Sequence, residues 1–200
     1  VWTHEGVERV IRYAFEAARR RDKAKRVTLV DKANAIRPMD LWTRTFETVA
    51  KDFPEIETDH AYIDAACMWM VKNPDWFDTV VTDNLFGDII TDLGAMLQGG
   101  LGIAASGNLH PGRVSMFEPI HGSAPKYKGL NKACPVATVM AVQMMLDYLG
   151  DADGATLVED AVGAALRKKT IPSLRAGDIA TDAAGDAIVA ELNELAASRG

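Results

Sequence analysis

The stretch NLFGDIITD, residues 84–92, joins two kinds of secondary structure. The apolar and β-branched segment 77–82 before it is typical of a strand, whereas apolar residues then recur at helical spacing through Leu97. Asp88 and Asp92 share one face of this expected helix, because an α-helix completes a turn about every 3.6 residues. We therefore expect a strand whose carboxyl end leads directly into a helix that carries two carboxylates.

The two carboxylates allow two interpretations. Like charges at this spacing repel each other by about 0.2–0.5 kcal/mol on an exposed helix, and a divalent cation would compensate them. Mg²⁺ and Mn²⁺ prefer such oxygen ligands, and α/β sheets place their ligands at strand ends of this kind. The simpler interpretation is a solvated helix face, which is the commoner meaning of two aspartates four residues apart.

Strands and helices alternate along the rest of the chain. We expect strands at 26–30, 56–62 and 77–82, and helices at 5–21, 39–53, 64–72, 84–97, 135–149, 155–168 and 184–197. Glycine, proline and small polar residues predict loops at 99–107 and 118–129. The alternation indicates an α/β fold built from βαβ units. The helix at 64–72 is apolar almost all round, so it should be buried, against a partner subunit if not within the chain.

Lys32 and Asp64 stand at the ends of expected elements. Lys32 follows the strand at 26–30 closely, and a lysine there can act as a general base if neighbours or burial lower its pKa. The simpler interpretation is a surface lysine. Asp64 opens the apolar helix, where a carboxylate also interacts favourably with the helix dipole.

The segment EPIHGSAP, residues 118–125, favours contact with a nucleotide. Its small residues let a planar ring or a phosphate approach the backbone closely, and His121 can stack on a base or hydrogen-bond to it. A tight turn with a structural histidine is the alternative. No GxGxxG motif follows a strand, which argues against the standard dinucleotide-binding fold.

Composition narrows the function classes. The formal net charge of -6 argues against a nucleic-acid partner or an anionic membrane surface. Cys67 and Cys134 lack any close spacing, so we expect reduced thiols in a cytoplasmic protein. No apolar run approaches the length of about 20 residues that spans a bilayer. The chain begins at Val1 rather than Met, and we expect sequence upstream of it.

These motifs together resemble the isopropylmalate/isocitrate dehydrogenase family, the β-decarboxylating dehydrogenases. The most specific are the stretches at 84–92 and 118–125. The match also includes ER at 8–9, AFEAA at 14–18, DKAN at 31–34 and DAA at 64–66. It covers nearly the whole chain in order and is most similar to the isopropylmalate branch.

The resemblance implies an isopropylmalate-dehydrogenase-like α/β fold that is incomplete, with its N-terminal part missing. Residues 1–98 would be part of the central, dimerisation domain, which holds the catalytic lysine and the metal-binding aspartates. Residues 99–200 would be the carboxyl-terminal part of the nucleotide-binding domain. The partner implied is a second copy of the chain, in a homodimer with a shared active site.

The resemblance also implies roles for individual residues. Lys32 matches the catalytic lysine, and Asp64 matches a catalytic, metal-binding aspartate that is lent across the dimer. Asp88 and Asp92 match the metal ligands of the other subunit, for Mg²⁺ or Mn²⁺. The nucleotide-binding residues would be Glu118, His121, Gly122, Ser123, Ala124, Pro125, Lys126 and Tyr127.

The choice between NAD and NADP stays open. NAD-using members usually carry an acidic residue after the position of Pro125, where Lys126 and Tyr127 stand here. A cation at this place attracts the extra phosphate of NADP, which an aspartate repels. The general isopropylmalate-like character favours NAD. Cys134 also replaces an asparagine that is common near the adenine in the family.

The implied activity is oxidative decarboxylation of a 2-hydroxy acid. The leading prediction is 3-isopropylmalate to 2-oxoisocaproate in leucine biosynthesis, and the alternative within the family is isocitrate, tartrate or D-malate. A non-catalytic regulatory subunit is the alternative of another class, but it would be expected to lack Lys32, Asp88 or Asp92. The family's tyrosine and substrate-binding arginines lie before the position of Val1. We therefore expect the 200-residue chain alone to be inactive.

Overall fold

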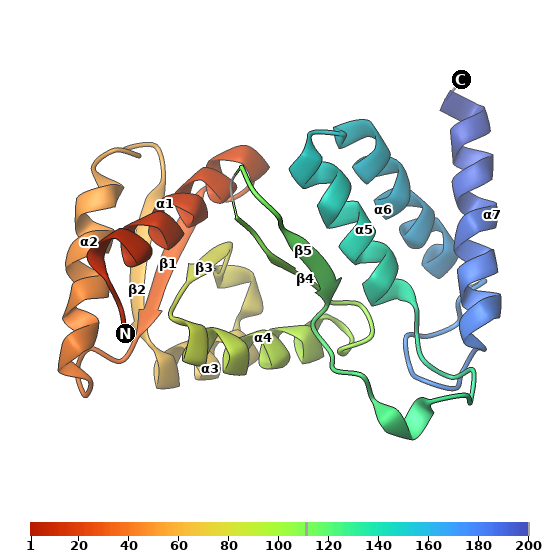
Figure 1. Ribbon diagram of the computed structural model, residues 1–200, viewed down its shortest axis with the longest axis horizontal. Helices are drawn as coiled ribbons and strands as arrows, with labels where there is room; N and C mark the ends of the chain where they lie inside the picture. The colour runs from red at the N-terminus through yellow and green to blue at the C-terminus, as the bar shows by residue number, and fades with distance from the viewer. Residues whose placement is uncertain (111, 200) are drawn as a thin grey trace. The chain divides into compact units, whose positions relative to one another are not determined.

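The computed structural model describes residues 1–110 and 112–199, which form two compact units (Figure 1). The first unit runs from Val1 to Gly94 and the second begins at Ala95. The mixed α/β architecture confirms the predicted fold class. The functional roles predicted for 1–98 and 99–200 stay predictions.

The first unit is built on a three-stranded parallel sheet in the order β2-β1-β3. Its elements are α1 (His4–Arg21), β1 (Arg26–Asp31), η1 (Arg37–Met39), α2 (Asp40–Ala50), β2 (Glu57–Tyr62), α3 (Ile63–Lys72), η2 (Pro74–Trp76) and β3 (Thr79–Val81). The helix α4 (Asn84–Gln98) begins in this unit. The carboxyl ends of parallel strands meet at one edge of a sheet, so the residues that follow β1, β2 and β3 gather there.

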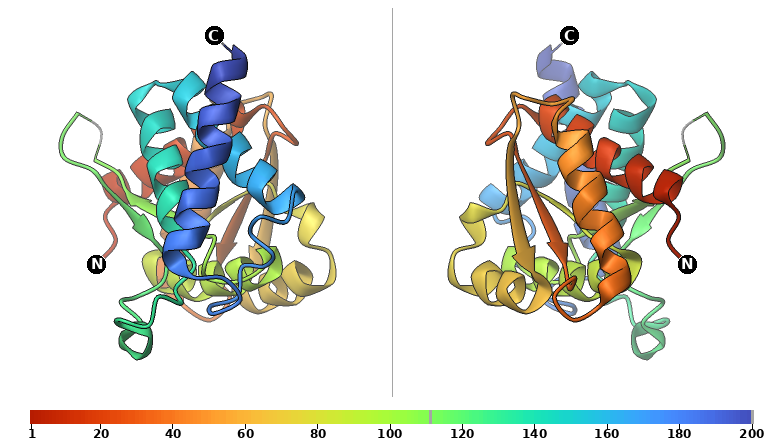
Figure 2. Two further views of the ribbon diagram at one scale, coloured as in Figure 1. Left: turned by 90° about the vertical axis from the view of Figure 1, so that its right-hand side faces the viewer. Right: turned by 90° about the vertical axis from the view of Figure 1, so that its left-hand side faces the viewer.

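Helices α1 and α2 lie over one face of this sheet (Figures 1 and 2). The side chain of Thr3 caps α1 by accepting the N–H of Gly6, and Asp22 ends the helix in the left-handed conformation. Apolar residues at helical spacing on α1 and α2 pack against β1 in one core cluster. Phe15 is fully buried at its centre, with ring centroids 5.3 Å from Phe46 and 5.1 Å from Phe53.

We expect Phe15→Ala to lower the free energy of unfolding by about 3–5 kcal/mol, because it removes a buried ring and leaves a cavity among two others. Urea unfolding of the full-length protein, followed by circular dichroism, measures the change. Val10→Ala on the exposed side of the same helix is the control and should cost about 0.5 kcal/mol or less. Equal losses for the two variants would show that this cluster is not the core of the unit.

The second unit combines a two-stranded antiparallel ribbon with three helices. Its elements are β4 (Ala105–Asn108), β5 (Met116–Pro119), η3 (Pro125–Tyr127), α5 (Val136–Leu149), α6 (Ala152–Arg167) and α7 (Thr181–Arg199). Helix α5 packs on the ribbon, and α6 lies between α5 and α7 (Figure 1). Val136, Ala161, Ala165 and Ile188 are among the buried residues of its core.

Four predictions for this half of the chain were wrong in detail. Residues 105–108 form β4 rather than the end of a glycine-rich loop, because they pair with β5. Glu118 and Pro119 belong to β5 for the same reason, so the predicted loop at 118–129 begins two residues later. Helices α6 and α7 also begin about three residues before the predicted starts, because the apolar spacing on which we relied begins after their first turns.

Helix α3 departs most from expectation, since within this chain it is not buried. Ala66 is its only buried residue, whereas Met68 and Val71 are 55% and 61% exposed. Leu85 and Ile89 on α4 are exposed to a similar degree. Apolar surface therefore gathers on the two helices that follow β2 and β3. Among the described residues, no helix combines the length and apolar character needed to cross a membrane.

Candidate active site

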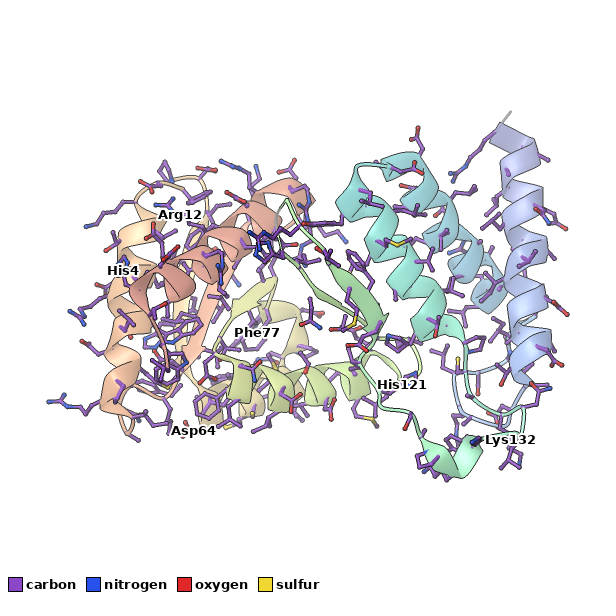
Figure 3. All side chains as sticks on the ribbon, viewed as in Figure 1. His4, Arg12, Asp64, Phe77, His121 and Lys132 are labelled. Atoms are coloured by element: carbon purple, nitrogen blue, oxygen red, sulfur yellow. The ribbon has the colours of Figure 1, made fainter. Side chains whose placement is uncertain are left out.

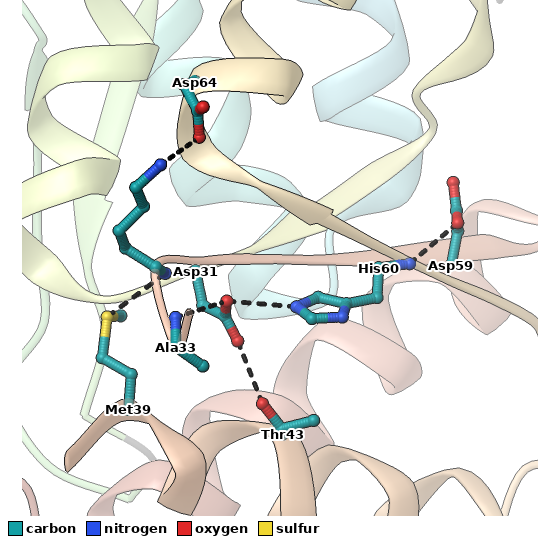
Figure 4. Close-up of polar contacts among 8 residues, drawn as sticks. Asp31, Ala33, Met39, Thr43, Asp59, His60 and Asp64 are labelled. Atoms are coloured by element: carbon teal, nitrogen blue, oxygen red, sulfur yellow. Dashed lines mark hydrogen bonds and ion pairs between the residues drawn. The ribbon is translucent and has the colours of Figure 1, made fainter. Parts of the chain in front are cut away.

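Lys32 leaves the carboxyl end of β1 and reaches Asp64 in the first turn of α3 (Figure 4). The ammonium Nζ of Lys32 donates to the carboxylate Oδ1 of Asp64. Strands β1 and β2 are parallel and adjacent, with Asp31 opposite Tyr62, so the residues that follow both strands arrive at the same place. The sheet topology thus brings together two predicted site residues that are 32 positions apart.

The backbone of Lys32 is held on both sides. Its N–H lies 3.3 Å from the sulfur of Met39, and its carbonyl accepts the N–H groups of Ala35 and Ile36 at 2.9 and 2.8 Å. The backbone groups of Lys32 are thus engaged, so its side chain is the part that can reach a ligand.

The carboxyl of Asp64 is kept ionised. The Lys32 ammonium is the main reason that its pKa lies below the usual range, and the N–H groups of Asp64 and Ala65 at the helix start add to the effect. The Asp64 side chain is 70% exposed, so the ion pair contributes little to stability. An exposed, ionised carboxylate beside a strand end is available as a cation ligand.

Asp88 and Asp92 lie one turn apart on α4, as their spacing predicts, and both are exposed. The buried Asp83 before them accepts the N–H of Phe86 at 2.8 Å and so caps the helix. Among residues 1–110 and 112–199, no ion pair or hydrogen bond reaches the carboxylate of Asp88 or Asp92. The donor set therefore fits a hard divalent cation, although it supplies only two protein ligands.

Within one chain, the three predicted metal ligands do not form a cluster. The described residues contain no group of three histidine, cysteine, aspartate or glutamate side chains placed to hold a metal ion. Asp64 pairs with Lys32 instead. This arrangement is compatible with the prediction that Asp64 serves a second copy of the chain, and that prediction stays untested.

The predicted nucleotide-binding residues lie together in the second unit, from β5 to η3; Figure 3 labels His121 there and Asp64 in the first unit. Glu118 is exposed on β5 opposite Ser106, and His121 Nδ1 lies 2.9 Å from the carbonyl oxygen of Gly122. A Cβ added at Gly122 would meet no atom within 4 Å. The segment thus has the open backbone that a planar ring or a phosphate needs.

The end of this segment has an unusual backbone. Ala124 adopts the left-handed conformation, with φ 42° and ψ 61°, directly before Pro125. That conformation is costly for a residue with a Cβ and is further disfavoured before proline. Lys126 then lies with its Nζ 4.9 Å from the centre of the Tyr127 ring. The two residues predicted to decide cofactor choice therefore form one cation–aromatic pair, in which Lys126 is exposed and Tyr127 is half-buried.

Burial raises the pKa of the Cys134 thiol. The thiolate is the reactive form, so we expect the alkylation rate of Cys134 in the folded protein to keep rising with pH above about 8.5, the ordinary pKa of a thiol. Iodoacetamide labelling, read by mass spectrometry of the Cys134 peptide, measures the profile. The urea-unfolded chain is the control and should level off near the ordinary value. Coincident profiles would contradict the placement of Cys134.

A pocket of about 440 Å³ lies elsewhere in the first unit and is lined by Arg26, His60, Trp69 and Trp76 among others. Neither Lys32 nor Asp64 lines it. Sequence reasoning did not find the side chains that contact Asp31, which are those of Thr43 and His60. A buried aspartate directly before Lys32 was the available signal, but nothing in the sequence pairs it with a histidine 29 residues later.

The chain belongs to the isocitrate/isopropylmalate dehydrogenase family, whose model matches residues 1–194. Two curated relatives are named 3-isopropylmalate dehydrogenase. The protein from Frankia casuarinae is 50% identical over 92% of this chain and 56% of its own length. The protein from Streptomyces griseus is 48% identical over 93% of this chain and 53% of its own length.

Solved structures agree with the family. An isocitrate dehydrogenase from Methylococcus capsulatus matches with a TM-score of 0.90 and 41% identity, over 96% of this chain and 57% of that one. The TT0538 protein from Thermus thermophilus matches with a TM-score of 0.86 and 35% identity, over 96% of this chain and 39% of that one. The chain thus spans about half the length of the curated relatives it matches.

Proposed function

We propose that the full-length protein that carries this chain converts 3-isopropylmalate to 2-oxoisocaproate and carbon dioxide, with NAD and Mg²⁺ or Mn²⁺, in leucine biosynthesis. The observation that carries the proposal is the pairing of Lys32 with Asp64 at the carboxyl edge of a parallel sheet. The identity of about 50% to proteins named 3-isopropylmalate dehydrogenase favours this substrate. We assign the enzyme to the cytoplasm, where Cys67 and Cys134 would stay unpaired and reduced.

Lys32 serves as the general base in this proposal. When bound, the cation polarises the substrate's 2-hydroxyl and the nicotinamide accepts the hydride. Lys32 takes the hydroxyl proton, directly or through a water molecule. Nζ of Lys32 donates to Asp64 in this chain, so the lysine must leave this acceptor before it can reach the substrate. Asp64 would be one ligand of the cation, and in that role it would release the Lys32 side chain for the substrate.

Asp88 and Asp92 hold the cation from one protomer, and Asp64 completes the site from the other. Because Lys32 donates to Asp64 of its own chain, both residues come from the same protomer. The exposed Met68, Val71, Leu85 and Ile89 supply the apolar surface that a second copy would cover. We therefore propose a homodimer in which α3 and α4 form the interface.

A substrate panel tests the proposed reaction. The full-length protein is assayed with 3-isopropylmalate, isocitrate, D-malate and tartrate, each with NAD or NADP, by formation of reduced nicotinamide and release of carbon dioxide. We expect kcat/KM for 3-isopropylmalate to exceed that of each other acid by at least about 100-fold. Preference for isocitrate, which the 41% identical solved relative makes the second candidate, would overturn the substrate. Absence of turnover with all four acids would overturn the reaction.

Lys126 decides cofactor choice in this proposal, because its exposed ammonium can meet the extra phosphate of NADP. We expect Lys126→Asp to lower kcat/KM for NADP by about 10-fold or more, which corresponds to the loss of one charge-assisted hydrogen bond. The value of kcat/KM for NAD should change much less. Lys128→Asp, with the same charge change two residues away, is the control. Equal losses with both cofactors would remove Lys126 from this role.

A further inference from the structure

We propose that the buried Asp31 is a positioning residue that sets the geometry of Lys32, with His60 as its partner across the sheet. This inference rests on the proposed function, since it assigns a support to the proposed base. Asp31 is the last residue of β1 and is fully buried. Two hydrogen-bond donors and the ring of His60, from separate parts of the chain, converge on its carboxylate (Figure 4).

The first contact bridges the turn that carries Lys32. The Oδ1 atom of Asp31 accepts the N–H of Ala33 at 3.0 Å. A carboxylate that bonds to the backbone two residues on closes a turn, and the residue inside this turn is Lys32. The Asp31 side chain therefore acts on the backbone angles of Lys32, and these set the direction in which the long lysine side chain departs.

The other two contacts fix the carboxylate itself. The Oγ1 atom of Thr43 on α2 lies 3.1 Å from Oδ2, and Nε2 of His60 on β2 lies 3.1 Å from Oδ1. A buried carboxylate is costly unless hydrogen bonds compensate it, and an apolar residue at this place would avoid the cost. Packing of the core therefore does not require a charged residue at position 31. The turn at Lys32, in contrast, uses the Asp31 carboxylate as the acceptor that closes it.

His60 extends the arrangement to the second site residue. It stands on β2 four positions before Asp64, and its ring makes an edge contact with Tyr62 at 5.3 Å between centroids. The contact between Asp31 and His60 thus ties the end of β1, which leads to Lys32, to the end of β2, which leads to Asp64. This contact fixes the two halves of the proposed site relative to each other.

The test uses Asp31→Asn, His60→Ala and His60→Gln in the full-length enzyme. We expect Asp31→Asn and His60→Ala to lower kcat by about 10- to 100-fold, because a displacement of about 1 Å at a reacting group has a cost of this size. KM and Mn²⁺ affinity should change less than about threefold, since neither residue touches a ligand in the proposed site. His60→Gln can still donate to Asp31 and should recover most of the loss.

Controls separate positioning from general damage. Asp75→Asn, a matched change at an exposed aspartate of the same unit, should keep wild-type kcat. His60 is exposed, so His60→Ala should fold even if Asp31→Asn does not. Unchanged kcat in His60→Ala, or equal losses in His60→Ala and His60→Gln that follow the melting temperature, would overturn the proposal.

A second measurement keeps this inference distinct from the proposed function. The rate of acetylation of Lys32, relative to Lys128 in the same molecule, is read by mass spectrometry and needs no substrate. We expect the ratio to rise at least about threefold in His60→Ala, because a lysine released from its turn spends less time on Asp64. An unchanged ratio would overturn the positioning role. Failure of the wild-type protein on the substrate panel would overturn only the proposed reaction.

Discussion

Replacing Lys32 with methionine is expected to lower kcat of the full-length enzyme about 1,000-fold, within the range that general-base catalysis supplies. Methionine keeps much of the length of the side chain but cannot take a proton. The Lys32 side chain is only 24% exposed, and contacts with Met39, Ala35 and Ile36 fix its backbone at the strand end. Steady-state kinetics with the preferred acid measure the loss.

Two observations complete this prediction. Lys128→Met, on the exposed segment after η3, is the control and should retain wild-type kcat. Mn²⁺ affinity of the Lys32 variant should be retained or increased, because Asp64 no longer has a competing ammonium. A loss of less than about 10-fold in kcat would mean that Lys32 is not the general base.

Asp88→Asn is expected to weaken Mn²⁺ binding by at least about 100-fold, because removal of a direct ligand should cost no less than loss of an outer-shell partner. Asparagine has nearly the same size, so the change removes charge with little effect on packing. The prediction depends on the absence of any ion pair at Asp88 among residues 1–110 and 112–199, which leaves its carboxylate available. Isothermal titration with Mn²⁺ measures the affinity without a need for turnover.

Asp92→Asn should behave like Asp88→Asn, because the two side chains lie one helical turn apart on α4. Asp75→Asn, at an exposed aspartate of the same unit, is the control and should leave Mn²⁺ affinity unchanged. Unaltered affinity in both the Asp88 and Asp92 variants would restore the simpler interpretation, a solvated helix face.

The sequence predicted most of the elements, because apolar periodicity and end signals are local. Helix α5, for example, ends at Gly150 in the left-handed conformation that glycine favours. The strand β4 was missed because residues 105–108 carry little β-propensity, and their structure depends on pairing with β5. Pairing of this kind is a property of the folded chain and leaves no local pattern.

The sequence predicted which residues belong to the candidate site, but not which of them contact each other. Lys32 and Asp64 were selected by their places at element ends, and the order of strands then brings them into contact. The contact between His60 and the buried Asp31 could not be foreseen, because it depends on the register of β1 against β2. Helix α3 shows another limit of the sequence. An apolar helix is predicted to be buried, but the pattern does not indicate whether its own chain or a partner covers it, and within this chain α3 is exposed.

The most direct test of the shared site is the activity of mixed dimers. Lys32→Met and Asp88→Asn variants, each nearly inactive alone, are co-expressed with different tags, and the activity of the mixture is measured. If Lys32 and Asp64 of one protomer serve the Asp88 and Asp92 of the other, each mixed dimer contains one intact site. Random pairing should then restore about one quarter of wild-type activity, because half of the dimers are mixed and only one of the two sites in each mixed dimer is intact. Activity that stays at the level of the separate variants would contradict the shared site.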